Sequence, residues 1–331
     1  MRHMRNFRLF ILVFSSILFF FQSSCKHSET LEVRDFFAMD TLCRIQVDEE
    51  HMFLLADAER MTKAFEDRLS RFKEGSVLVR LNKDRSVNDD ELVKILMQYS
   101  QLPDDVKAVF SVLLGDIIDS WDIRDGGKVP LNAELAALLH DFRTSKFSIQ
   151  NTVVTLHGNA DMDLGGLLKG YLCGELARYF ESQGVKRYII DLGGNIAVYS
   201  SQPYTWKIGI KNPDGDGIAG YIQSNKRRLF VATSGNYERF FIKDGKRYHH
   251  ILDPNTGYPS EGMKSVTVVT DSGIMSDVLS TVFFIMKEKK ATRFLTAQPQ
   301  TAVIFIDSVG TFQQINCAGG TDDTGMLFWQ F

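Results

Sequence analysis

The sequence is poor in cysteine and proline and carries no excess of one charge. Only 4 of its 331 residues are cysteine and 7 are proline, and 38 basic residues stand against 41 acidic ones, a net charge of −3. This balance gives no electrostatic reason to expect a nucleic-acid partner. Cys43, Cys173 and Cys317 lie far apart, which excludes a Cys-x-x-Cys redox pair and a zinc-type spacing. We expect buried, unpaired thiols; in an oxidising compartment two of the three could pair, and the sequence does not say which.

Long apolar runs are confined to the N-terminus. The first eight residues contain three arginines and no acid, and residues 9–21 are apolar apart from two serines. This run is shorter than the roughly 20 residues of a membrane-spanning helix and is typical of a signal peptide. The Ser-Ser-Cys ending at Cys25 resembles the lipobox of bacterial lipoproteins, although Gln22 stands where leucine is usual.

We therefore expect a signal peptide at 1–24, a lipid anchor at Cys25, a linker at 25–35 and one domain at 36–331. This organisation predicts a protein of the bacterial cell envelope, anchored in the membrane, most simply the inner one, and facing the periplasm. An ordinary signal peptide or an uncleaved anchor is the alternative.

The remaining chain has the composition of a globular protein. It is 44% hydrophobic and 24% charged, which excludes a disordered chain or a coiled coil. Apolar spacing predicts helices over 51–70, 89–101, 105–121, 166–183 and 273–287, and another that begins after an N-cap at Asn132. Strands are predicted near 146–156 and at 188–192, 196–200, 205–210, 229–233, 238–243, 247–251, 264–270, 301–307, 312–316 and 326–330. This order favours an α/β (α+β) fold, a single large domain with mixed or antiparallel sheets and flanking helices.

Two glycine pairs stand where the chain could approach a ligand. In the segment 163–171, Gly165 and Gly166 open a predicted helix, where exposed amide groups and the helix dipole attract anions and Lys169 adds a charge. Close packing that only glycine permits is the structural alternative. Gly193 and Gly194 join two predicted strands; a tight turn explains them, as does close approach of a ligand.

Three polar side chains later in the chain could carry chemistry. His250 lies at the end of a predicted strand before the polar turn 253–257, and histidine can transfer protons near pH 7, although a lone histidine is usually structural. Asp277 and Thr281 share one face of a predicted helix, and their oxygens suit Mg²⁺ rather than zinc. A solvated helix face is the alternative, but this helix is largely apolar, and a buried aspartate without a partner is costly.

Taken in order, these motifs resemble those of the ApbE-type FAD:protein FMN transferases over roughly residues 36–290. The matching segments begin at Met39-Asp40-Thr41 and Ser70-Arg71-Phe72 and continue with 163–171, 192–195, 233–237, 250–257 and 277–281. The sequence departs from the family pattern at five positions. Asp40 replaces a glycine and Asn195 replaces the commoner aspartate. Ser111, Val112 and Leu113 replace an aspartate, a proline and a threonine near the flavin.

The resemblance implies an ApbE-like, T-fold-like domain and a Mg²⁺-dependent enzyme. Such an enzyme would bind FAD and transfer FMN to a Ser or Thr hydroxyl of a partner protein, releasing AMP. By resemblance, the metal ligands would be Asp277, Thr281 and the carbonyl of Gly166, with Ser280 nearby. Lys169 would contact the FAD phosphates, and His250 would take the proton of the acceptor hydroxyl, with Asp277 as an alternative base. The remaining contacts with FAD would come from Met39, Phe72, Asp163 and Ile251.

Acceptors of the family carry the motif Asp-Gly-x-(Ser/Thr)-Gly-Ala-(Thr/Ser) and include subunits of membrane redox complexes. This chain lacks the motif, so the resemblance implies a donor enzyme rather than a protein that is itself flavinylated. Two alternatives remain open: an FAD pyrophosphatase that yields FMN and AMP, and a lipoprotein that binds FAD without turnover.

Overall fold

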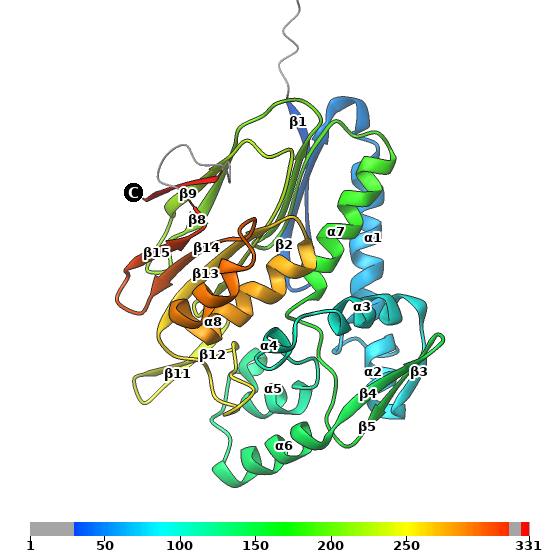
Figure 1. The fold of residues 1–331 in the computed structure, drawn as a ribbon. Helices are drawn as coiled ribbons and strands as arrows, with labels where there is room; N and C mark the ends of the chain where they lie inside the picture. The colour runs from blue at the N-terminus through cyan, green and yellow to red at the C-terminus, as the bar shows by residue number, and fades with distance from the viewer. Residues whose placement is uncertain (1–29, 318–325, 331) are drawn as a thin grey trace, which may run out of the picture. The chain divides into compact units, whose positions relative to one another are not determined.

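The computed structural model describes residues 30–317 and 326–330 of the chain (Figure 1). The described residues from Leu31 onward belong to one compact unit. The predicted signal peptide at 1–24 and the lipid anchor at Cys25 lie outside the described residues. None of the helices in the described part is long and apolar enough to cross a bilayer.

An eight-stranded sheet forms the centre of this unit, and each strand in it runs antiparallel to its neighbours. The fold-class prediction of antiparallel sheets with flanking helices is thereby confirmed. The strands, in spatial order, are β1 (Leu31–Ala38), β2 (Thr41–Asp48), β6 (Arg187–Leu192), β7 (Asn195–Ser200), β10 (Arg228–Gly235), β13 (Met263–Thr270), β14 (Ala302–Asp307) and β15 (Phe312–Ile315).

Three helices cover one face of this sheet: α1 (Leu54–Leu69), α7 (Leu168–Ser182) and α8 (Gly273–Thr296). Figure 1 shows α7 alongside α1 and α8 crossing the sheet below them. Apolar side chains of α8, including the fully buried Val278, Phe283 and Phe284, pack into the main core with residues of β10 and β13. The part of α8 around Asp277 is therefore buried and is not a solvated helix face.

The other face of the sheet is covered by a three-stranded sheet, β16 (Met326–Gln330), β9 (Ile218–Ser224) and β8 (Trp206–Lys211). Trp206 and Ile208 of β8 pack with Val231 and Ile304 of the central sheet in a second core. Because β10, β13 and β14 are buried on both faces, apolar residues follow one another in β14 (AVIFID) and at the start of β10 (LFVA), and the polar residues of β13 are mostly small hydroxyl side chains.

The remaining elements form a layer around the end of the sheet where the hairpins turn. A small sheet consists of β3 (Ser86–Asn88), β5 (Val153–His157) and β4 (Lys146–Gln150), and β11 (Phe240–Lys243) and β12 (Lys246–His249) form a hairpin. The helices are α2 (Val77–Asp84), α3 (Asp90–Ser100), α4 (Asp104–Lys107), α5 (Gly115–Trp121) and α6 (Asn132–Thr144), with 3-10 turns at Glu49–His51 and Ile123–Asp125.

Three local predictions were wrong. The single helix predicted at 105–121 is two short helices, because the chain between them pairs with residues 161–163: the amide of Gly115 donates to Asp161 O at 3.0 Å and that of Asp163 to Val112 O at 2.8 Å. The cap of α6 is Leu131 rather than Asn132. The predicted linker at 25–35 overlaps β1, which begins at Leu31.

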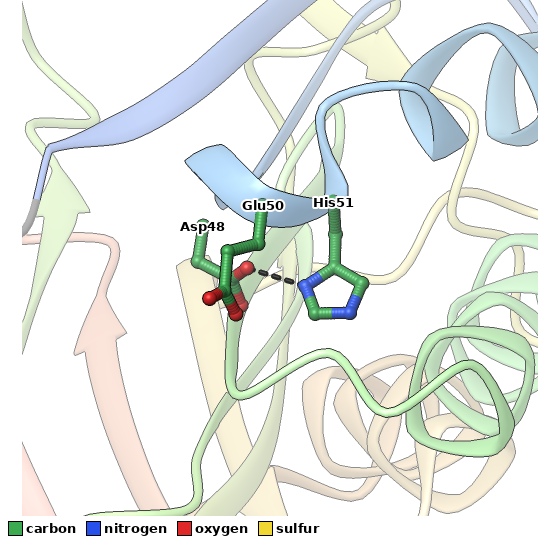
Figure 2. Close-up of side chains that lie close together, drawn as sticks. All are labelled: Asp48, Glu50 and His51. Carbon is green, nitrogen blue, oxygen red and sulfur yellow. Dashed lines mark hydrogen bonds and ion pairs between the residues drawn. The ribbon is translucent and has the colours of Figure 1, made fainter.

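Asp48, Glu50 and His51 form a polar group at the end of β2 (Figure 2), and hydrogen bonds to Asp48 connect this strand to the start of β6. Asp48 Oδ2 accepts the backbone N–H of Lys186 at 2.8 Å and of Arg187 at 3.2 Å, and its other oxygen contacts His51 Nδ1. Glu50 forms an ion pair with Lys186 Nζ at 2.8 Å. Burial raises the pKa of Asp48, but these hydrogen bonds outweigh it and hold the pKa below its usual value. The charges of this group are satisfied within the protein, so we assign it a structural role.

Candidate active site

Two tight turns lie side by side at one end of the central sheet. Met39 and Asp40 join β1 to β2 with φ of 54° and 57°, and Gly193 and Gly194 join β6 to β7 with φ of 69° and 92°. Positive φ at both central residues is the geometry of a hairpin turn that follows the twist of the strands. A Cβ on Gly193 would lie 2.1 Å from Thr41 Oγ1, so the two turns are in close contact.

A hydrogen bond within the segment fixes the glycine-rich residues 163–166 before α7. Asp163 Oδ1 accepts the amide N–H of Gly165 at 2.8 Å, and its other oxygen lies 3.4 Å from Arg71. A Cβ on Gly166 would lie 2.8 Å from the ring of Phe110, so no side chain fits there. The start of α7 therefore presents bare backbone followed by Lys169, the arrangement that the sequence predicted as an anion site. Both carboxylate oxygens of Asp163 already contact protein groups, the Gly165 amide and Arg71. A contact of Asp163 with FAD stays a prediction.

Asp277 is held at the crossing of α7 and α8. Its Oδ2 accepts the backbone N–H of Gly170 at 2.8 Å. Burial raises the pKa of Asp277, and Lys169, Asn195 and the Gly170 amide only partly offset that rise. The Asn195 amide on β7 lies close enough to this carboxylate to lower its pKa but outside hydrogen-bond geometry, so its buried Nδ2 has no hydrogen-bond partner among the described residues. A buried carboxylate of this kind is costly without a cation beside it.

One turn further along α8, the hydroxyls of Ser280 and Thr281 lie close to that of Ser234. Ser234 Oγ of β10 lies 2.8 Å from Ser280 Oγ and 3.2 Å from Thr281 Oγ1. A Cβ on Gly166 would lie 4.0 Å from Thr281 Oγ1, so the start of α7 reaches the same place. The structure thus brings Asp277, Ser280, Thr281 and Gly166 together from segments more than 100 residues apart. Ser234 was not among the predicted site residues. The sequence motif that contains it was recognised, but strand pairing alone could not show that its hydroxyl points toward α8.

These donors fit a hard divalent cation. A carboxylate, hydroxyls and a backbone carbonyl are the oxygen ligands that Mg²⁺ takes, and the cluster contains no thiolate or imidazole. The Asp277 carboxylate is buried, and its Oδ2 accepts a backbone hydrogen bond from Gly170. The residues present therefore fit Mg²⁺.

His250 follows β12 and is held by Arg239. Both its backbone N–H and its ring Nδ1 lie 3.2 Å from Arg239 O. Because a carbonyl only accepts, Nδ1 carries the proton and Nε2 keeps a lone pair. Burial lowers the pKa of His250 to about 3, with the charges of Arg239 and Lys169 adding to the effect. His250 is therefore neutral at pH 7 and able to accept a proton on Nε2.

The neighbouring His249 fixes the end of β12. Its Nε2 donates to Ser260 O at 2.7 Å, and its Nδ1 accepts the backbone N–H of Ile251 at 3.3 Å. The polar turn that follows is also held within the protein, since Trp121 Nε1 donates to Gly257 O at 2.7 Å. The residues on both sides of His250 are thus fixed, which limits the positions open to its ring.

The predicted flavin contacts differ in exposure. Met39 lies in the β1–β2 turn and packs partly against the core, and Ile251 is buried within it. Phe72 is 53% exposed, with the guanidinium of Arg124 4.1 Å from its ring centroid. That cation–π contact links Phe72 to Asp40, which forms an ion pair with Arg124 at 3.2 Å. Contact of Met39, Phe72 and Ile251 with FAD stays a prediction.

Two of the cysteines lie in the core beside these groups. Cys43 and Cys173 are buried free thiols, as the sequence predicted. Burial raises the pKa of Cys43 to about 11 and that of Cys173 well above its usual value. Both thiols are therefore protonated and unreactive at neutral pH.

The fold and site define an α/β protein in which a cluster of carboxylate and hydroxyl oxygens lies next to a glycine-rich helix start. A sequence model of the ApbE family matches residues 39–305, most of the chain. The chain belongs to the ApbE family.

Similar proteins agree with this assignment. A Klebsiella pneumoniae protein named FAD:protein FMN transferase is 32% identical over 206 residues, which are 60% of this chain and 63% of that protein. A Treponema pallidum protein of the same name is 29% identical over 301 residues, 80% of this chain and 82% of that protein.

Solved structures show the same fold. The ApbE protein from Thermotoga maritima has a TM-score of 0.79 at 26% identity, covering 86% of this chain and 97% of that one. The flavin transferase ApbE from Vibrio cholerae has a TM-score of 0.71 at 22% identity, covering 86% of this chain and 96% of that one.

Proposed function

We propose that this chain is a Mg²⁺-dependent FAD:protein FMN transferase. It moves FMN from FAD to a Ser or Thr hydroxyl of a partner protein, forms a phosphoester and releases AMP. Membership of the ApbE family and relatives named FAD:protein FMN transferase support flavin transfer. The observation that carries the proposal is the meeting of Asp277, Thr281 and Gly166 beside Lys169.

Asp277, Thr281 and the carbonyl of Gly166 would hold the Mg²⁺, with Ser280 in support. When bound there, Mg²⁺ supplies charge neutralisation for the diphosphate and the leaving AMP. The Gly170 amide keeps the Asp277 carboxylate in place, and the Ser234 hydroxyl does the same for Ser280 and Thr281. Lys169 would bind a phosphate oxygen as a point charge.

His250 would take the proton of the acceptor hydroxyl on Nε2 as that oxygen attacks phosphorus. Its neutral form at pH 7 and the fixed Nδ1 proton leave Nε2 as the accepting atom. A general base in this position contributes typically about 10²–10⁴-fold to the rate. Asp277 is less suited to this step, since its Oδ2 already accepts from Gly170 and a bound metal would lower its basicity.

The flavin and adenine would lie against Met39, Phe72 and Ile251, near the two hairpin turns. Asp163 would contribute indirectly, by holding the Gly165 amide and so shaping the backbone that faces the diphosphate.

The proposal extends to where the protein works and what it modifies. A lipid anchor at Cys25 would hold the domain at the bacterial membrane, facing the periplasm. The acceptors would be subunits of membrane redox complexes that carry Asp-Gly-x-(Ser/Thr)-Gly-Ala-(Thr/Ser). The balanced charge of the chain gives no support for a nucleic-acid partner.

The test incubates the purified protein with FAD, Mg²⁺ and a fragment bearing the acceptor motif, and examines the fragment by intact mass spectrometry. The proposal predicts an FMN adduct on the motif hydroxyl, together with AMP, and no adduct on a fragment with that residue changed to alanine. FMN and AMP without an adduct would instead establish a pyrophosphatase. FAD that stays bound and intact after Mg²⁺ is added would establish a flavin-binding protein.

A further inference from the structure

Arg239 connects the proposed base to an open cavity. Its backbone oxygen accepts the N–H of His250 and lies 3.2 Å from His250 Nδ1, while its own side chain is exposed. That side chain lines a cavity of about 390 Å³ together with Asp40, Ile123, Arg124, Glu238 and Phe240. The residue whose backbone holds His250 thus also lines a solvent-open cavity.

The charges around this cavity are paired, with one exception. Asp40 forms an ion pair with Arg124 at 3.2 Å, and Glu238 forms one with Lys211 at 3.2 Å. The guanidinium of Arg239 makes no ion pair or hydrogen bond with any residue in the described part of the chain. The cavity therefore presents one uncompensated positive charge, and an anion is the group that would complete it.

We propose, on the basis of the proposed function, that Arg239 binds a carboxylate of the acceptor protein and thereby positions the acceptor hydroxyl at His250. An acidic segment fits, because the planar guanidinium binds a carboxylate through two parallel hydrogen bonds. The FAD phosphates have their own cation in Lys169, which is partly buried at the start of α7. Arg239 is instead exposed, and its backbone contacts His250, so a protein can reach it next to the proposed base.

The cavity lining supports a protein occupant. Phe240 in this lining is 37% exposed, and the guanidinium of Arg247 lies 4.2 Å from its ring centroid. Exposed aromatic rings and arginines are the side chains that protein interfaces favour.

The experiment compares Arg239→Gln and Arg239→Lys with Lys243→Gln. Lys243→Gln removes the same charge from the same hairpin, but Lys243 lies outside the cavity lining. Binding of the acceptor fragment is measured directly, with FAD present and Mg²⁺ withheld, and FAD affinity is measured separately by flavin fluorescence. A second fragment has the motif aspartate changed to asparagine.

We expect Arg239→Gln to weaken fragment binding at least about 10-fold, as expected for loss of a charge-assisted hydrogen bond. FAD affinity should stay within about twofold, Arg239→Lys should recover part of the loss, and Lys243→Gln should bind as the unchanged protein does. The asparagine fragment should show a smaller loss with Arg239→Gln than the aspartate fragment shows, because the two changes remove one interaction.

Three results would overturn the inference. They are weaker FAD binding with unchanged fragment binding, equal losses for Arg239→Gln and Lys243→Gln, and no fragment binding by the unchanged protein. Failure of the proposed function gives a different result: the fragment binds in an Arg239-dependent manner, but no FMN adduct forms when Mg²⁺ is added.

Discussion

The backbone N–H of Gly170 donates to Oδ2 of Asp277 at 2.8 Å, joining residues 107 positions apart. Only glycine permits this contact, because a Cβ at residue 170 would lie 2.2 Å from Gly273 O and 2.6 Å from the Asp277 Cβ. The close crossing of α7 and α8 therefore determines where the buried carboxylate lies, and a structural glycine becomes part of the site.

The close crossing of α7 and α8 predicts that alanine substitutions at two glycines one turn apart on α7 have opposite effects on stability. Gly170→Ala should lower the free energy of unfolding by more than about 2 kcal/mol, because the helices must separate. Gly174→Ala should raise it by about 0.5–1 kcal/mol, since alanine favours the helix and its Cβ would meet only Arg178, at 3.8 Å. Urea unfolding measures both. Equal effects would show that the two helices are not packed as described.

Asp277→Asn should separate function from stability. The amide oxygen can still accept from Gly170, while the ligand charge is lost, so activity should fall at least about 100-fold. Burial raises the pKa of Asp277, so its ionisation opposes folding as pH rises above the unfolded value. Without Mg²⁺ at pH 7, the variant should therefore unfold at a temperature equal to or above that of the unchanged protein. A clear loss of stability would contradict the assigned burial.

Removal of the imidazole from His250 should reduce turnover more than FAD binding. His250→Asn should lower kcat by about 10²–10⁴-fold and leave FAD affinity within about twofold. Comparable losses in kcat and in FAD affinity would assign His250 to donor binding instead.

The lowered pKa values of His249 and His250 predict how the stability of the protein changes as the pH falls. His249 and His250 have pKa values of about 4 and about 3, because burial disfavours their charged forms. When unfolded they bind protons below about pH 6.5, so their contribution to stability is full above that pH and is lost as pH falls toward 4. The stability difference between the unchanged protein and His250→Asn should therefore shrink from pH 7 to pH 5. A difference that grows would contradict the lowered pKa of His250.

The left-handed backbone at Asp40 predicts a tolerated replacement. Asp40→Gly loses an exposed ion pair worth about 0–1 kcal/mol, and glycine adopts φ of 57° without strain. The free energy of unfolding should change by less than about 1 kcal/mol. Asp40→Val should lower it by about 1 kcal/mol or more, since a β-branched residue disfavours positive φ. Equal results for the two variants would remove the turn geometry as the cause.

Sequence patterns predicted the elements that carry the candidate site residues better than they predicted the surrounding elements. The helix with Asp277 and Thr281, the glycine-rich start of α7 and the Gly193–Gly194 turn follow from local periodicity and turn chemistry, and each lies where it was predicted. The Asp40 departure is understandable for the same reason, since aspartate tolerates the left-handed turn that glycine favours.

The errors arose where distant contacts override local preference. Residues 108–114 have helical periodicity, but backbone bonds to residues 161–163 pull them out of a helix. β1 escaped notice because it is an edge strand with exposed residues on both faces, including Val33 and Phe37 on one face and Arg34 on the other. Ser234 and Arg239 could not be assigned without the packing of β10 on α8 and the hydrogen bond from His250.

The most direct test of the account is a crystal of the protein grown with FAD and Mn²⁺ in place of Mg²⁺, with the metal located by its anomalous scattering. We predict one strong peak within coordination distance of Asp277 and Thr281 oxygens and of the Gly166 carbonyl. A metal bound elsewhere, for example at the Asp48, Glu50 and His51 group, with none beside Asp277, would contradict the proposed site and the mechanism that depends on it.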